Sequence, residues 1–157
     1  IDYIETEKNY ISSPKFEKDK NYWENLFENI PELVSLTGSK DIQDNRTSSK
    51  RESFRVNISV AKKIQEYCAQ NKISIFNFFM AIYSIYLSKT YGIEEFVIGT
   101  PILNRTNFKE KNTMGMFVNT IPVKISLSQS EKFIDFVHSL SSNMLNNLKH
   151  QKYGKTS

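Results

Sequence analysis

The sequence predicts an α/β fold, in the form of a two-layer sandwich with helices packed on one face of a mixed sheet. Five segments have the pattern of helices, and three shorter segments have the alternation or the continuous apolar run of strands. The two kinds interleave in the order α, α, β, α, α, β, β, α, and no internal repeat is present. Such an order places the strands in one sheet with the helices as a covering layer.

Composition indicates a globular chain. Its 157 residues are 39% hydrophobic and 13% aromatic, enough for a core and the length of one domain or a piece of one. The first residue is Ile1, and we expect the chain to begin inside a longer polypeptide. No apolar run reaches the roughly 18 residues that suggest a membrane-spanning helix, so we expect no membrane partner.

Charge and cysteine content exclude several site classes. The net charge is +4, and the cations are largely interleaved with acids. The densest basic stretch, residues 46–55, lies in polar sequence, which favours a solvated loop over a nucleic-acid interface. The single cysteine excludes an intramolecular disulfide and a four-thiolate zinc site. We therefore expect a reducing, cytoplasmic location.

Two helices are predicted at the N-terminus, over residues 2–12 and 14–30. Ser13 can cap the second helix, and Pro14 suits its first turn, where a missing N–H costs nothing. Pro31 is expected to end it. Its apolar stripe consists of Trp23, Leu26, Phe27 and Ile30. Trp23 is expected to anchor this helix in the core.

The next segment predicts a loop, a strand and a helix. Residues 37–53 are polar and indicate a loop. Alternation over residues 54–58 predicts a half-buried strand. Ser59 is expected to cap a helix on whose apolar stripe Cys68 lies, as a buried small side chain rather than a reactive thiol. That stripe is Val60, Ile64, Tyr67 and Cys68.

The centre of the chain predicts the core. Ser74 caps a helix over 75–91 that is apolar nearly all round, which places Phe79 inside, and Gly92 is a plausible stop. The apolar run 96–102 predicts a central strand covered on both faces. A polar loop follows over 103–115.

The last strand and helix carry one polar residue on an apolar face. Residues 116–127 predict a strand whose odd positions point inward, and Asn119 shares that parity. A buried amide needs hydrogen-bond partners, so Asn119 either braces a neighbouring loop or lines a substrate channel. Asn104 and Arg105, just past a strand, are open to the same two interpretations. A helix is predicted over 131–150, with an inner face of Phe133, Phe136, Val137, Leu140, Met144 and Leu148.

The residues alone assemble no catalytic site. His138 is expected to face solvent, and His150 lies at a helix end where a capping or surface role is expected. No His-x-x-x-His or Cys-x-x-Cys pair could hold a metal, and no G-x-S-x-G elbow is present.

Two stretches resemble the condensation domain of nonribosomal peptide synthetases. Residues 99–105 read G-T-P-I-L-N-R, and residues 114–124 read M-G-M-F-V-N-T-I-P-V-K, similar to the family's (I/V)-G-x-F-V-N-T motif. Three further segments fit the family pattern: residues 3–23, the S-I-F of residues 74–76, and His150-Gln151-Lys152-Tyr153. The last of these resembles the opening of the family's H-Q-D-Y-P-F-E motif. The resemblance identifies residues 1–157 as a partial condensation domain, most of its C-terminal lobe.

The resemblance implies one lobe of a fold like that of CoA-dependent acyltransferases, with a channel between this lobe and an N-terminal lobe. Peptidyl or acyl carrier proteins of adjacent modules would insert phosphopantetheine arms bearing two thioesters, and an amide bond would form between them. The domain itself would bind no cofactor. The product class implied is a peptide antibiotic or lipopeptide. The channel candidates are Asn104, Arg105, Gly115, Phe117, Asn119 and Thr120, with Gln151 as a weaker one.

The resemblance leaves catalysis outside these residues. The family's catalytic motif, H-H-x-x-x-D-G, does not occur in the 157 residues, so we expect no catalytic residue here and an inactive fragment. Lys152 and Gly154 replace the family's Asp and Pro. Three alternatives stay open: an epimerization domain of the same synthetases, a stand-alone CoA-dependent acyltransferase, and a non-catalytic docking or scaffold module.

Overall fold

The computed structural model describes residues 2–31, 50–128 and 130–153. The predicted loop 37–53 lies outside this range except for residues 50–53, which have no regular structure. The fold is α/β, as predicted. In chain order the elements are α1 (Asp2–Ile11), α2 (Pro14–Leu26), α3 (Ile58–Gln70), α4 (Ile75–Tyr91), β1 (Glu95–Ile102), α5 (Phe108–Lys111), β2 (Asn119–Ser126) and α6 (Phe133–Lys149).

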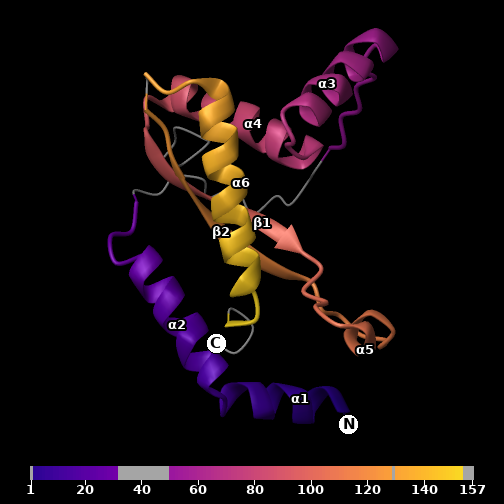
Figure 1. Cartoon of the computed structure of the whole chain (residues 1–157), viewed down its shortest axis with the longest axis vertical. Coiled ribbons are helices and arrows are strands. Elements are labelled where there is room, and N and C mark those ends of the chain that lie inside the picture. The colour runs from indigo at the N-terminus through magenta and orange to yellow at the C-terminus, as the bar shows by residue number, and fades with distance from the viewer. Residues whose placement is uncertain (1, 32–49, 129, 154–157) are drawn as a thin grey trace.

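The sheet in the described part of the chain is smaller than expected. It consists of β1 and β2, paired antiparallel, whereas a mixed sheet needs at least one parallel pair. Glu95 lies opposite Ser126 and Ile102 lies opposite Asn119. Figure 1 shows α6 crossing this hairpin, while α1 and α2 form an arm that reaches the end of α6.

One face of the hairpin carries the core. Phe96, Ile121, Val123 and Ile125 are buried on it, which confirms the inward odd positions of the second strand. The opposite face includes the exposed Gly99 and Pro101, so the expectation of a central strand covered on both faces is wrong for the described residues. A strand with a single neighbour and one helical layer has only one face to bury.

The caps that the sequence predicts are largely confirmed. The side chain of Ser13 accepts a hydrogen bond from the N–H of Phe16, that of Ser74 accepts one from Asn77, and Gly92 ends α4 with φ of 66°. A left-handed residue at that position favours glycine. The helix α2 ends at Leu26 rather than Ile30, which is exposed.

The strand expected over residues 54–58 is wrong. These residues are extended but pair with no strand in the described part, and Phe54 is 89% exposed. Alternation alone does not make a strand, since the backbone groups need a ladder partner. The helix after it begins at Ile58, two residues earlier than predicted, because Asn57 and not Ser59 is its cap.

The long helix α4 is not buried all round. Its inner face contributes Ala81, Ser84 and Leu87, and it packs against α6. Phe79 is 48% exposed, so its expected place in the core is wrong. An outer row of α4 is exposed as well: Ile75, Phe76, Ile82, Tyr83 and Tyr86. The two helices that pack on α4, α6 and α3, leave its outer side open whatever its composition.

Trp23, Cys68 and the α6 stripe are where the sequence predicts them. Trp23 and Cys68 belong to the buried core together with Phe136, Val137, Leu140 and Met144 of α6. Phe133 and Leu148 are half-buried against that core. The helix α6 is thus the layer that ties the hairpin, α4 and α2 together.

Candidate binding site at the β1–β2 connection

The candidate residues gather where β1 ends and β2 begins. The connection between the strands, residues 103–118, includes α5 where the sequence predicted only a polar loop. In Figure 1 it extends from one end of the sheet. The helix forms because Asn107 and Glu110 make a capping box, with the Asn107 side chain accepting from the N–H of Glu110.

Arg105 is the centre of this connection. Its guanidinium donates hydrogen bonds to the carbonyl oxygens of Glu110, Thr113 at 2.7 Å and Gly115 at 2.9 Å. The same group lies 4.0 Å from the centroid of the Phe117 ring, a cation–π contact. Arg105 therefore fixes the shape of the connection through backbone contacts.

Asn104 is buried and strained. Only 6% of it is exposed, and its backbone φ is 49°. Among the described residues its Oδ1 is the one buried side-chain oxygen or nitrogen without a hydrogen-bond partner. An acceptor left in this state costs about 1–3 kcal/mol. It lies at a cavity of about 20 Å³ that Thr6, Glu7, Tyr10, Glu110, Phe117 and Lys152 also line.

Gly115 and Phe117 shape the approach to β2. Gly115 has φ of 144°, a conformation that side chains with a Cβ rarely adopt. Phe117 is 5% exposed, and its ring lies 3.6 Å from where a Cβ on Gly115 would stand. Glycine is therefore required by the backbone rather than by lack of space.

Asn119 and Gln151 are brought together from positions 32 residues apart. Asn119 is half-buried, and its Nδ2 donates to the carbonyl oxygen of Gln151 at 3.5 Å, the long end of the hydrogen-bond range. Its Oδ1 accepts from the N–H of Thr120 at 2.9 Å. The Gln151 side chain donates to the Leu148 carbonyl. Thr120 is itself exposed. Its Cγ2 lies 3.2 Å from where a Cβ on Gly99 would stand.

Glu110 and Lys152 form an ion pair that the sequence did not predict. Lys152 Nζ lies 2.8 Å from Glu110 Oε1. Burial alone would raise the pKa of Glu110, but the hydrogen bonds from Lys152 and Thr106 outweigh it and lower the pKa to about 2. The N-x-x-E spacing of residues 107–110 was a signal that could have revealed Glu110, whereas nothing in the sequence pairs it with Lys152.

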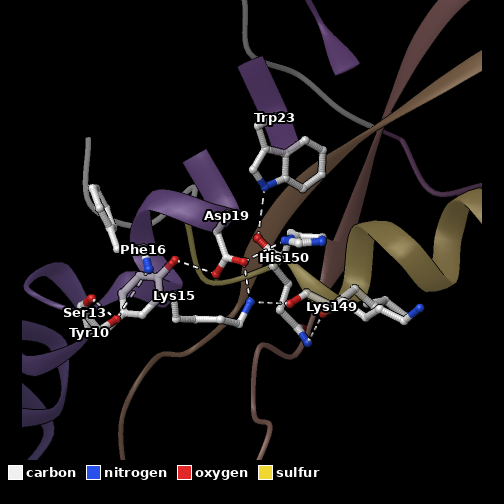
Figure 2. A network of polar contacts seen from close by, with 10 residues as sticks. Tyr10, Ser13, Lys15, Phe16, Asp19, Trp23, Lys149 and His150 are labelled. Carbon is white, nitrogen blue, oxygen red and sulfur yellow. Dashed lines mark hydrogen bonds and ion pairs between the residues drawn. The ribbon is translucent and has the colours of Figure 1, made fainter. Parts of the chain in front are cut away.

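A second network fastens α2 to the end of α6. Figure 2 shows the carboxylate of Asp19, which is fully buried, held by Tyr10, Lys15 and His150. The Tyr10 hydroxyl donates at 2.9 Å, and Nδ1 of His150 lies 2.6 Å from Asp19 Oδ1. Burial acts to raise the pKa of Asp19, but the hydrogen bonds from these three partners lower it below its usual value. Sequence analysis did not single out Asp19.

Aromatic and amide contacts complete this network. Nε1 of Trp23 donates to the His150 carbonyl at 2.9 Å, and the Tyr22 ring stacks on the His150 ring at 4.0 Å. The Tyr22 hydroxyl donates to Asn147, whose amide donates to the Pro122 carbonyl of β2. His150 is the C-cap residue of α6, which confirms the capping interpretation, while its side chain is mostly buried rather than on the surface. Sequence analysis did not single out the buried Asn147.

The remaining histidine, His138, is part of no metal-binding cluster in the part of the chain that the structure describes. His138 is exposed, as predicted, and no cluster of three or more His, Cys, Asp or Glu side chains could hold a metal there. Over the same residues, no helix has the length and apolarity needed to cross a membrane. The candidate site is a set of polar and aromatic contacts around Arg105, Phe117 and Asn119.

A family model and the relatives found by sequence comparison point to the same family of proteins. The sequence model described as Condensation domain matches residues 1–156. Surfactin synthase subunit 1 of Bacillus subtilis (strain 168) is 36% identical over 153 residues, which cover 98% of this chain and 4% of that protein. Gramicidin S synthase 2 of Aneurinibacillus migulanus is 29% identical over 153 residues, covering 97% of this chain and 3% of that protein. The chain therefore spans only a small part of the length of either synthetase.

Solved structures agree in fold. The first condensation domain of the calcium-dependent antibiotic synthetase, in complex with a substrate analogue, superposes with a TM-score of 0.79 at 24% identity. The superposition includes 94% of this chain and 33% of the chain of that structure. VibH, an NRPS condensation enzyme, superposes with a TM-score of 0.75 at 21% identity, with 98% of this chain covering 35% of that one.

Proposed function

The chain belongs to the condensation-domain family, and we propose that it supplies most of the C-terminal lobe of a domain that forms an amide bond in nonribosomal peptide biosynthesis. In the proposed reaction, the amine of a downstream aminoacyl thioester attacks the carbonyl carbon of an upstream acyl or peptidyl thioester. A C–N bond forms, the C–S bond breaks, and the thiol leaves on its carrier arm. We place this assembly in the cytoplasm.

One observation carries the proposal. The two stretches that resemble the family, 99–105 and 114–124, form the paired ends of one hairpin, with Ile102 opposite Asn119. The polar residues of both stretches thereby meet at one end of the sheet, beside the 150–153 turn. A channel wall needs such a rigid edge, because a binding group must be held in place by residues that are themselves fixed.

The named residues would have different roles in that wall. Asn119 is half-buried at the strand start, and its Nδ2 makes only a long hydrogen bond to Gln151 while its Oδ1 accepts from Thr120. Its Nδ2 is therefore the group best placed to contact a substrate amide. Thr120 and Gln151 flank Asn119. Arg105, Gly115 and Phe117 would shape the wall, and Asn104 would offer its unpartnered oxygen within the adjoining cavity.

The base for the reaction would come from outside these residues. His150 is committed to Asp19 and Tyr22, and His138 is exposed on the outer side of α6. The partners we infer are an N-terminal lobe of the same domain and two carrier proteins with their adjacent modules. The phosphopantetheine arms belong to those carriers and enter as parts of the substrates.

A single-turnover assay tests the proposal. The intact domain that contains residues 1–157 is mixed with one carrier loaded with an acyl thioester and one loaded with an aminoacyl thioester, and the products are analysed by mass spectrometry. We expect an amide on the downstream carrier. Exchange of an α-proton for deuterium in D₂O without an amide would favour an epimerization domain, and acylation from acyl-CoA alone would favour a stand-alone acyltransferase. Either result would contradict the proposal.

A further inference from the structure

An ion pair joins the β1–β2 connection to the turn that follows α6. Glu110 Oε1 and Lys152 Nζ are 2.8 Å apart although the residues are 42 positions apart in the sequence. The Glu110 side chain is 11% exposed and the Lys152 side chain 31%. This pair is thus shielded from water on the Glu110 side, unlike an ordinary surface pair.

The second oxygen of Glu110 organises the start of the connection. Oε2 accepts hydrogen bonds from the N–H of Thr106 at 2.5 Å, the hydroxyl of Thr106 at 2.8 Å and the N–H of Asn107 at 3.3 Å. One carboxylate therefore holds both the beginning of α5 and Lys152. Lys152 and Thr106, the neighbour of Arg105, are therefore bound to the same carboxylate.

The two segments that the pair joins carry the proposed channel residues. On one side, Arg105 and Phe117 shape the connection, and Asn104 faces the cavity that Glu110 and Lys152 also line. On the other side, the Gln151 carbonyl next to Lys152 accepts from Asn119. The residue next to Lys152 thus contacts Asn119, and the ion pair of Lys152 itself holds the connection 103–118.

We propose that Lys152 and Glu110 are positioning residues that fix the connection 103–118 against the 150–153 turn, and so set the width of the proposed channel beside Asn119. This inference rests on the proposed function. Lys152 stands where the family pattern quoted above has an acidic residue, which would repel Glu110 at this distance. Glu7, which lines the same cavity, is the other carboxylate near both groups.

Hydrogen exchange on the full chain tests the fastening independently of activity. In Lys152→Met, which keeps the length of the side chain and removes its charge, we expect the amides of Thr106 and Asn107 to exchange about tenfold faster. Lys152→Arg should restore protection, because it keeps a cation within reach. Lys149→Met is the matched control and should leave these amides unchanged. The exposed Lys149 side chain bonds to nearby Asn146, and the substitution keeps the Lys149 carbonyl that accepts from Lys15. Equal exchange in Lys152→Met and wild type would overturn the inference.

Steady-state kinetics of the intact domain tests the positioning role. Lys152→Met should lower kcat/KM for amide formation by about threefold to tenfold, and Lys152→Arg should recover it. Faster exchange with unchanged kcat/KM would show a merely structural pair and overturn the positioning role. Failure of the wild-type domain to form any amide would instead overturn the proposed function, while the exchange result would still decide whether the pair fastens the connection.

Discussion

The carboxylate of Asp19 lies 2.6 Å from Nδ1 of His150, 131 residues further along the chain. This contact joins the N-terminal arm to the end of α6, and Figure 2 shows that Lys15 and Trp23 reinforce it from the same helix. The arm, the hairpin and the 150–153 turn are held as one unit by polar contacts as well as by the apolar core.

Removing the buried charge of this network should destabilise the fold. We expect Asp19→Asn to lower the free energy of unfolding by about 2–3 kcal/mol, because hydrogen bonds to a charged group are lost inside the protein. Glu17→Gln, at an exposed position of the same helix, should stay within about 0.5 kcal/mol of wild type. Urea denaturation measures both variants, and equal midpoints for Asp19→Asn and wild type would show that the network contributes no stability.

Stability should fall at acid pH through two carboxylates. The pKa of Asp19 and that of Glu110, which falls to about 2, are lower in the folded chain than their ordinary values. Groups of this kind stabilise the fold at pH above their ordinary pKa, and the contribution disappears as the pH falls towards the folded value. For Glu110 the contribution is at most about 3 kcal/mol, lost between about pH 4.5 and 2.

A denaturation series from pH 7 to pH 2.5 measures this effect. Glu110→Gln should be less stable than wild type at pH 7, and the difference should shrink as the pH falls. A difference that is the same at every pH would mean that the charge of Glu110 plays no part.

Two phenylalanines should respond very differently to truncation. Phe96 is fully buried in the hairpin, so Phe96→Ala should cost about 3–5 kcal/mol. Phe79 is 48% exposed on the outer side of α4, so Phe79→Ala should cost less than about 1.5 kcal/mol. Thermal or urea unfolding of the two variants compares them directly, and similar losses would contradict the exposed position of Phe79.

Local signals in the sequence predicted the elements well. Ser13, Ser74 and Gly92 set helix ends through bonds to residues within four positions, and the alternation of Ile121, Val123 and Ile125 identified a strand with one buried face. Such features depend on neighbours in sequence, and the sequence therefore contains them. The strand at 54–58 failed because a strand also depends on a partner elsewhere.

The site was predictable in part for the same reason. The resemblance singled out the two ends of the hairpin, and the structure brings Asn119 to Gln151. The contacts that join distant segments, Glu110 with Lys152 and Asp19 with His150, were not predictable from periodicity or spacing. Each one pairs an ordinary charged residue with a partner that only the tertiary fold brings near.

The 157-residue chain should form no amide by itself. The H-H-x-x-x-D-G motif to which the resemblance assigns catalysis does not occur in the 157 residues. Mass spectrometry of two loaded carriers incubated with the chain alone should show only unreacted and hydrolysed thioesters. Sustained amide formation would mean that these residues contain the catalytic groups.

We propose that Asn119 lines a substrate channel, and the single-turnover rate of amide formation in the intact domain is the measurement that tests this proposal. Asn119→Ala gives up only a 3.5 Å hydrogen bond to Gln151 and the local bond to Thr120, so the denaturation midpoint should stay close to that of wild type. We expect a slower rate per folded molecule. A loss of about 1–3 kcal/mol of stability with an unchanged rate per folded molecule would contradict it and show that Asn119 is a structural brace.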